Sequence, residues 1–341
     1  MKNQLLHTPE GVRDIYGEEC ERKLELQSRL YKALGKFGYH SIQTPTFEFF
    51  DVFSREIGTT PSKELYKFFD REGNTLVLRP DITPSIARAA AKYYTDEDMP
   101  IRLRYQGSVF INNSSYQGRL KECTQLGAEL IGDDSVDADA EMITMTIEAL
   151  RNCELKEFQI SVGHVEFLQG LVEAANLNEE EAQTIRELIV NKNFFGVAEE
   201  IAKYSLPEEL TQLFGMLGKL YDRTADFSAA GALAANYSKV LCAIRRLEQL
   251  DEILQEHEVA SYVSYDLGML TDYHYYTGVI FAGYTYGTGE PIVRGGRYDN
   301  LLEHFGKKAP SIGFAFAVDQ IMTAISRQGL QTATESTSSY L

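Results

Sequence analysis

The sequence has few cysteines, and none of them is paired at a short spacing. The four cysteines include no C-x-x-C pair, and the six histidines include no H-x-x-x-H pair. A disulfide framework and a cysteine- or histidine-based metal site are therefore not expected. We expect four free thiols in a protein of the reducing cytoplasm.

Long hydrophobic runs are also missing. No stretch reaches 18 consecutive apolar residues, and the first residues, Met1-Lys-Asn-Gln-Leu-Leu-His-Thr8, lack the apolar centre of a signal peptide. We expect neither a membrane-spanning helix nor a secreted protein.

Basic segments and glycine-rich phosphate loops are absent too. The sequence contains neither G-x-x-x-x-G-K-[ST] nor G-x-G-x-x-G, which excludes a P-loop and a dinucleotide fingerprint. No run of five Lys or Arg residues occurs, and 50 acidic against 33 basic residues give a net charge of −17. This balance disfavours a nucleic-acid partner, because phosphate-backbone affinity comes largely from Lys and Arg. It favours solubility and suits a basic protein partner.

What the chain does contain is an ordinary globular composition, with 44% hydrophobic and 24% charged residues over 341 positions. Apolar periodicity and turn residues predict helices and strands in alternating groups. We expect helices over 17–37 and 137–152 and another helix that begins at Pro84. We expect a hairpin over 65–78 with its turn at 70–74. Further strands are expected as a pair at 101–111 and 122–131, around a polar loop at 112–118, and at 158–162.

A change of pattern marks the segment 166–257 as a mostly helical insertion. Capping boxes are expected at Asn178 with Glu181 and at Ser205 with Glu208, and helical spacing of apolar residues predicts a long helix over 236–257. Strands return at 263–265, 278–286 and 312–318, the last leading into a final helix. We therefore expect a discontinuous core of residues 1–165 and 258–328, with a flexible polar tail at 329–341.

Hairpin signals with few βαβ units favour an α+β fold with an antiparallel sheet flanked by helices. His274, in a tyrosine-rich run, is expected to be a packed or hydrogen-bonded ring rather than a ligand.

Several segments, in the right order from residue 8 to about 325, resemble the motifs of histidyl-tRNA synthetases. Phe37-Gly-Tyr39 through Pro45-Thr-Phe-Glu48 is similar to motif 1, which in that family builds the dimer interface. The other matching segments are Thr8-Pro-Glu-Gly-Val-Arg-Asp14, Leu78-Arg-Pro-Asp-Ile-Thr83, motif 2 over 105–132, Tyr273-His-Tyr-Tyr-Thr-Gly278, and motif 3 from Gly295-Gly-Arg-Tyr-Asp299 to Gly313-Phe-Ala315. The resemblance implies a class II aminoacyl-tRNA synthetase-like core with a helical insertion.

Positions that hold the amino acid in that family are kept. The resemblance implies a histidine-binding set of Asp81, Thr83, Gln125, Glu129, Tyr275 and Tyr276. Carboxylates suit an ammonium group or a donating imidazole, and amide and hydroxyl groups fix orientation. Two other interpretations stay open: Asp81 caps the helix near Pro84, and Gln125 and Glu129 are solvated strand residues.

Positions that serve ATP and transfer chemistry in that family are changed. The resemblance places its arginines at Ile111, Thr271 and Gln320, and a nearby glutamate at Asn113. None of these side chains can replace a guanidinium on phosphate, and phosphoryl chemistry depends on such cations. The short segment after Gln320 also leaves no room for an anticodon-binding domain, so we expect no tRNA recognition and no catalytic residue, cofactor or metal.

A histidine pocket without an ATP grip resembles the regulatory subunits of ATP phosphoribosyltransferase. That resemblance implies a non-catalytic partner of the short catalytic subunit, which self-associates as a dimer and mediates feedback by histidine in the first step of histidine biosynthesis. Two alternatives remain: an amino-acid-activating enzyme with another ATP grip, and a stand-alone histidine-binding module.

Overall fold

A computed structural model describes residues 6–53, 60–113, 120–271 and 275–330 of the chain. The end of the predicted tail (from Gln331), the tip of the polar loop (from residue 114) and His274 lie outside the described residues. Within these residues, nine strands form one sheet, in the order β1-β5-β6-β12-β11-β10-β7-β9-β8. Their bounds are β1 His40–Ser41, β5 Ile101–Phe110, β6 Glu122–Ile131, β7 Phe158–His164, β8 Leu220–Tyr221, β9 Val263–Asp266, β10 Val279–Thr285, β11 Val293–Arg297 and β12 Ser311–Ala317.

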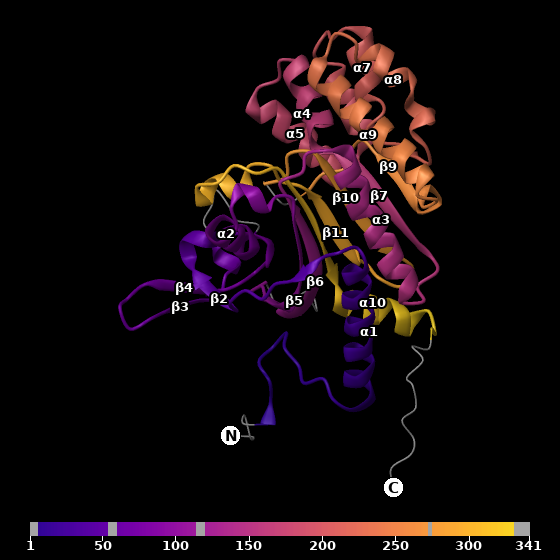
Figure 1. Ribbon diagram of the computed structural model, residues 1–341. Helices are drawn as coiled ribbons and strands as arrows, with labels where there is room; N and C mark the ends of the chain where they lie inside the picture. The colour runs from indigo at the N-terminus through magenta and orange to yellow at the C-terminus, as the bar shows by residue number, and fades with distance from the viewer. Residues whose placement is uncertain (1–5, 54–59, 114–119, 272–274, 331–341) are drawn as a thin grey trace.

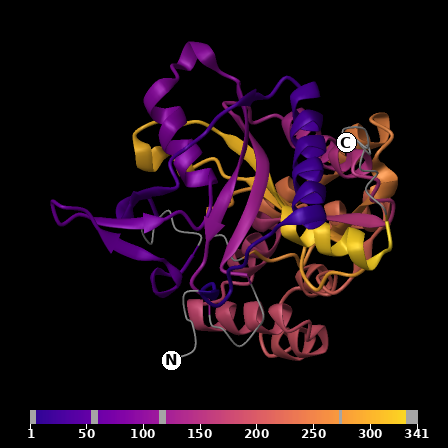
Figure 2. The same ribbon diagram turned by 90° about the horizontal axis from the view of Figure 1, so that it is seen from below.

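The predicted antiparallel sheet is present, with two parallel pairs toward its ends. β1 pairs with β5 and β7 pairs with β9 in parallel, and the other neighbours are antiparallel. A second sheet has the order β2-β4-β3, with β2 Phe47–Phe49, β3 Lys67–Phe69 and β4 Thr75–Leu78. β3 and β4 form the predicted hairpin, which projects away from the large sheet in both ribbon views (Figures 1 and 2).

Three helices cover one face of the large sheet: α1 Gly17–Lys36, α3 Val136–Asn152 and α10 Val318–Arg327. In α1, Leu26, Leu30 and Leu34 face the sheet and are completely buried, as their spacing of four residues predicts. On the strands beneath them, alternate residues such as Leu126 and Phe314 belong to the same core cluster. The intervening residues therefore face the opposite side of the sheet, where α2 Thr83–Tyr93 packs near β5.

The segment after β7 is helical, as expected, and gathers at one end of the molecule (Figure 1). Its helices are α4 Val165–Ala174, α5 Glu179–Val190, α6 Phe194–Ile201, α7 Glu208–Phe214, α8 Ala229–Leu233 and α9 Ser238–Glu256. The stripe predicted for the long helix is buried in α9, including Val240, Ile244 and Leu254. The division of the chain into a core and an insertion at 166–257 stays a prediction.

One of the two predicted capping boxes is wrong. Asn178 and Glu181 form the expected reciprocal pair at the start of α5. α7, however, begins only at Glu208, after the extended Pro207, and has no side-chain cap. Because a residue before proline is disfavoured in the helical region, Leu206 is a poor first residue for a helix capped by Ser205.

Strand β11 was not expected from the sequence, because Gly295 and Gly296 have low strand propensity. The four cysteines are free thiols, as predicted. No helix in the described part of the chain is long and apolar enough to cross a membrane.

Candidate functional site

A pocket lies on the face of the sheet opposite α1, α3 and α10. It contains about 510 Å³ of atom-free space, part of it open to solvent. All six residues of the predicted site line it, although they come from three separate stretches of the chain. The lining residues are Asp81, Thr83, Gln125, Glu129, Tyr275, Tyr276, Pro291, Val293, Arg294, Tyr298, Gly313, Phe314, Ala315, Phe316 and Ala317.

Strand register explains why these side chains meet. Alternate residues of β6 point to one face, so Gln125 and Glu129 lie opposite to the buried Leu126. Across the ladder, Glu129 pairs with Gly313 and Gln125 with Ala317, on β12. The pocket floor is therefore made of small residues, and the polar side chains of β6 stand along one side of it.

Glu129 is completely buried and has no cationic partner among the described residues. Its carboxyl accepts hydrogen bonds from the Thr83 hydroxyl (Oγ1–Oε1 2.7 Å) and from the Tyr298 hydroxyl. Burial raises its pKa to about 8, against an ordinary value near 4.5, and the hydrogen bonds from Tyr298 and Thr83 oppose that rise. Glycine is required at position 313, since a Cβ there would lie 1.5 Å from Glu129 Oε2.

Asp81 is the second buried carboxyl of the pocket. Its Oδ1 accepts from the backbone N–H of Ile82 at 2.7 Å, directly before α2, and its Oδ2 faces the Tyr275 hydroxyl at 3.5 Å. The helix-capping interpretation is wrong in this form, because the N-cap residue of α2 is Ile82, which has no side-chain cap, and Asp81 lies one residue before it. Burial raises the pKa of Asp81 despite these hydrogen bonds.

Arg79 fixes the loop that carries Asp81. Its guanidinium donates to the carbonyl oxygens of Ser108 (2.8 Å) and Thr44 (2.9 Å). Gly107 leaves room for it, because a Cβ there would lie 2.1 Å from Arg79 Nη2. Asp81 therefore enters the pocket from a loop tied to β5 and to the segment before β2.

Gln125 supplies an unused acceptor. Its Oε1 is buried and has no hydrogen-bond partner, which is costly unless a ligand supplies an N–H or O–H. The interpretation of Gln125 and Glu129 as solvated strand residues is wrong for Glu129, which is fully buried. Tyr275, Tyr276 and Tyr298 close the pocket with edge-to-face contacts, 4.8 Å between the first two ring centroids and 5.7 Å between Tyr275 and Tyr298.

Sequence reasoning missed nine of the fifteen lining residues, and three of these bear on the chemistry of the pocket: Tyr298, Gly313 and Arg294. Tyr298 and Gly313 lie inside the motif 3 segments already noted, so their presence in the site could have been proposed from those motifs. Arg294 directly precedes the Gly295-Gly296 pair, and only the strand register shows that it belongs to the pocket.

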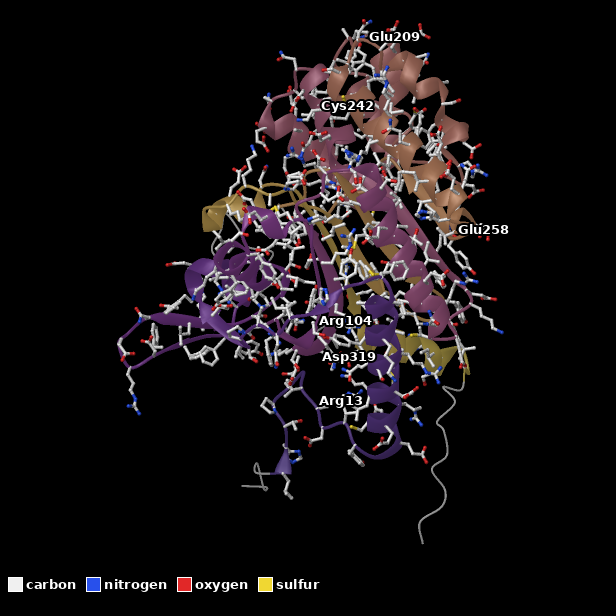
Figure 3. All side chains as sticks on the ribbon, in the orientation of Figure 1. Arg13, Arg104, Glu209, Cys242, Glu258 and Asp319 are labelled. Atoms are coloured by element: carbon white, nitrogen blue, oxygen red, sulfur yellow. The ribbon has the colours of Figure 1, made fainter. Side chains whose placement is uncertain are left out.

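The positions at which the resemblance expects ATP-binding groups hold neutral side chains. Ile111 continues the β5 hairpin, its N–H donating to the Lys121 carbonyl at 2.9 Å. Asp319, next to Gln320, is fully engaged: its carboxylate pairs with Lys23 of α1 at 2.7 Å and accepts from the Thr124 N–H at 2.7 Å. Figure 3 shows Asp319 beside α1.

Chemically, the pocket combines two uncompensated carboxyl groups, an orphaned amide oxygen and three tyrosine rings. Such a set suits a small ligand that carries a positive charge and N–H donors. Within the described residues, no group of three or more His, Cys, Asp or Glu side chains is arranged to hold a metal ion.

Comparisons with known proteins give a consistent result. The family model for histidyl-tRNA synthetase matches residues 11–321. The chain is 41% identical over 331 residues to an ATP phosphoribosyltransferase regulatory subunit of Acetivibrio thermocellus, covering 97% of this chain and 79% of that one. It is 38% identical over 331 residues to the regulatory subunit of Clostridium kluyveri, covering 96% and 84%.

Solved structures agree. An ATP phosphoribosyltransferase regulatory subunit/histidyl-tRNA synthetase from Bacillus halodurans is similar with a TM-score of 0.85 and 34% identity, over 94% of this chain and 83% of that one. A histidyl-tRNA synthetase from Nostoc shares the fold, with a TM-score of 0.80 at 20% identity over 96% of this chain and 77% of the other.

Proposed function

The chain belongs to the ATP phosphoribosyltransferase regulatory subunits, which have the class II fold of histidyl-tRNA synthetases, and from this premise we propose that it binds free histidine without activating it. In this proposal it assembles with a short-form catalytic subunit and makes the first step of histidine biosynthesis sensitive to the end product. The observation that carries the proposal is the contrast between two sets of positions. A pocket with two uncompensated carboxyl groups persists, while the positions of the ATP-binding arginines hold neutral side chains.

The ligand assignment follows from charge and hydrogen bonding. Histidine offers an ammonium group and an imidazole N–H, which suit the carboxyl groups of Asp81 and Glu129 and the unpartnered Oε1 of Gln125. Burial raises the pKa of both carboxyl groups because it disfavours their ionised forms. A bound cation would favour the ionised forms and so offset the cost of desolvation. Thr83 and Tyr298 would hold Glu129 in place for this contact.

We propose the absence of catalysis from the positions that have lost their cations. Removing a single preorganised donor typically costs an enzyme about 3–4 kcal/mol of transition-state stabilisation. In this chain Ile111, Thr271 and Gln320 replace three cations of the synthetase family, and Lys23 already neutralises Asp319. Histidine would therefore bind reversibly, to an extent set by its concentration, and would not be converted to a product.

Regulation requires that the assembly with the catalytic subunit has two states that differ in histidine affinity. A ligand shifts such an equilibrium only by its differential affinity, and the coupling is reciprocal. Histidine would thus lower catalytic activity to the extent that catalysis-competent assemblies bind it less tightly.

The proposal is tested on the complex purified with its short catalytic subunit. Histidine should inhibit the assembled phosphoribosyltransferase. It should also raise the unfolding temperature of the regulatory chain, because a ligand at 100 times its Kd stabilises the folded state by about 2.7 kcal/mol. Asp81→Asn and Glu129→Gln should each raise the histidine concentration for half-inhibition tenfold or more, since a buried charge-assisted hydrogen bond contributes about 1.5–3 kcal/mol. Glu122→Gln, an exposed carboxylate on the same strand, is the matched control.

Two results would contradict the proposal. Inhibition of both variants at the wild-type histidine concentration would place the regulatory site elsewhere. Histidine-dependent exchange of pyrophosphate into ATP by the isolated chain would favour the alternative, an amino-acid-activating enzyme.

A further inference from the structure

The pocket is charged at both of its sides, with opposite signs. Asp81 and Glu129 supply the acidic side, and Arg294 is the only cationic side chain among the lining residues that the structure describes. A site for a simple cation needs no such arginine. The arrangement suits a ligand with a positive group and a negative group at its two ends.

The position of Arg294 follows from strand register. Arg294 on β11 is opposite Ala315 on β12, and Ala315 is opposite Gly127 on β6. Gly127 lies midway between Gln125 and Glu129, so Arg294 is on the same face as these two side chains and two strands away. Neighbouring strands are about 4.8 Å apart, which puts roughly 10 Å between the backbone of Arg294 and that of β6.

The floor between the two charged sides is open to a ligand. Ala315 and Ala317 are only partly buried, and Gly313 has no side chain. A small molecule lying across β12 can therefore reach both β6 and β11. Larger side chains at these positions would separate the acidic from the basic side.

Arg294 itself is available for such a contact. It is exposed, and the ion pairs and hydrogen bonds among the described residues do not include it. The other arginine of the same strand, Arg297, is in contrast buried and paired with Asp139 at 2.6 Å. On β11, Arg297 is therefore held in an ion pair within the fold, whereas Arg294 is exposed and can contact a ligand.

From this geometry we infer that Arg294 binds the carboxylate of an α-amino-acid ligand whose cationic groups face Asp81 and Glu129. The inference rests on the proposed histidine-binding function and adds the residue that selects for the free amino acid. A guanidinium fork matches the two oxygens of a carboxylate, which makes arginine suited to this recognition. Amines that lack the carboxylate lose this contact and keep all the others.

The test compares histidine with histamine, which lacks the carboxylate, by calorimetric titration of the full chain and of its Arg294→Met variant. The wild-type chain should bind histidine at least tenfold more tightly than histamine. Arg294→Met should weaken histidine binding about tenfold and leave histamine binding unchanged, and Arg294→Lys should give an intermediate loss. Arg245→Met, at an exposed position of α9, should change neither affinity.

The outcomes separate the two proposals. If histidine binds the wild-type chain and Arg294→Met binds it equally well, or loses affinity for both ligands alike, the role of Arg294 is refuted while the histidine site stands. If the wild-type chain does not bind histidine, the proposed function fails, and the role of Arg294 fails with it.

Discussion

Glu129 shows how a single buried residue links the pocket to pH. Its carboxyl group is completely enclosed between Thr83, Tyr298 and the Gly313 backbone, and burial raises its pKa to about 8. Without a ligand, the folded chain therefore retains a proton that the unfolded chain loses near pH 4.5.

We predict that the ligand-free chain becomes less stable as pH rises from about 4.5 to about 8. In this window the folded state binds more protons than the unfolded state, so the Glu129 contribution is fully present below the lower value and lost at the upper one. The loss is on the order of a few kcal/mol. Asp81, whose pKa is also raised by burial, acts in the same direction.

Chemical denaturation across this pH range measures the effect. Glu129→Gln cannot ionise and should flatten the dependence, whereas Glu122→Gln should leave it as in the wild type. An unchanged slope in Glu129→Gln would show that Glu129 is not the titrating group.

Sequence reasoning identified the polar side chains of the pocket better than its shape. The six predicted residues could be identified because each belongs to a recognisable motif, and all six line one cavity. Arg294 carries no such signal, and the motif that contains Gly313 does not indicate why a glycine is needed there. The need for glycine at 313 arises from a contact with Glu129 on another strand, and the place of Arg294 depends on register. Neither is a local property of the chain.

At the scale of elements, a buried ion network joins three parts of the fold. Asp139 in α3 pairs with Arg297 of β11 at 2.6 Å and with Arg246 of α9 at 2.7 Å, and its side chain is completely buried. The strand that carries Arg294 is thereby tied to the longest helix of the helical segment. Tyr298, which contacts Glu129, directly follows Arg297.

We predict that Asp139→Asn destabilises the protein by about 3–5 kcal/mol, because the buried cation of Arg297 loses its shorter carboxylate contact and keeps only the one with Asp299 at 3.3 Å. Asp137→Asn is the control, since Asp137 lies exposed in the same first turn of α3 and should cost no more than about 1 kcal/mol. Equal unfolding free energies for the two variants, measured by urea titration, would show that the network does not stabilise the fold.

Elements with strong periodicity were predictable, and elements defined by distant partners were not. The spacing of Leu26, Leu30 and Leu34 predicted α1, and a similar spacing of apolar residues predicted α9. β11 escaped prediction because its glycines are selected by close packing: a Cβ at Gly296 would lie 2.8 Å from the Tyr276 ring. The parallel pairing of β7 with β9, which are separated by the helical segment, is also invisible to local patterns.

At the scale of the whole molecule, the small sheet presents aromatic residues to solvent. Phe47 and Phe49 on β2 are 51% and 56% exposed, and Phe69 on β3 is 72% exposed. Phe47 and Phe49 share a face, because the residue between them, Glu48, points inward and pairs with Arg88 at 2.7 Å. Exposed apolar clusters of this kind mark interaction surfaces.

We predict that the chain self-associates as a dimer through the region from Phe37 to Phe50. The double variant Phe47→Ser, Phe49→Ser should shift the protein to a monomer at micromolar concentration. In an isologous dimer both subunits use the same surface, so each substitution removes its contacts twice. Phe195→Ser, at an exposed position of α6, should not change the mass. Light scattering that gives a monomeric mass for the wild-type chain would refute this prediction.

The place of β12 in the large sheet has a consequence for how the protein is made. Ser311–Ala317 is the last strand of the sheet in sequence, yet it lies between β6 and β11 and joins the two halves of the sheet. Until the ribosome has released these residues, β6 and β11 each have an open edge that can pair with other nascent chains. The pocket floor is formed by the same strand, so the proposed histidine site cannot form in a growing chain before this strand has emerged. We therefore expect any stabilisation by a ligand to begin only after β12 has left the ribosome.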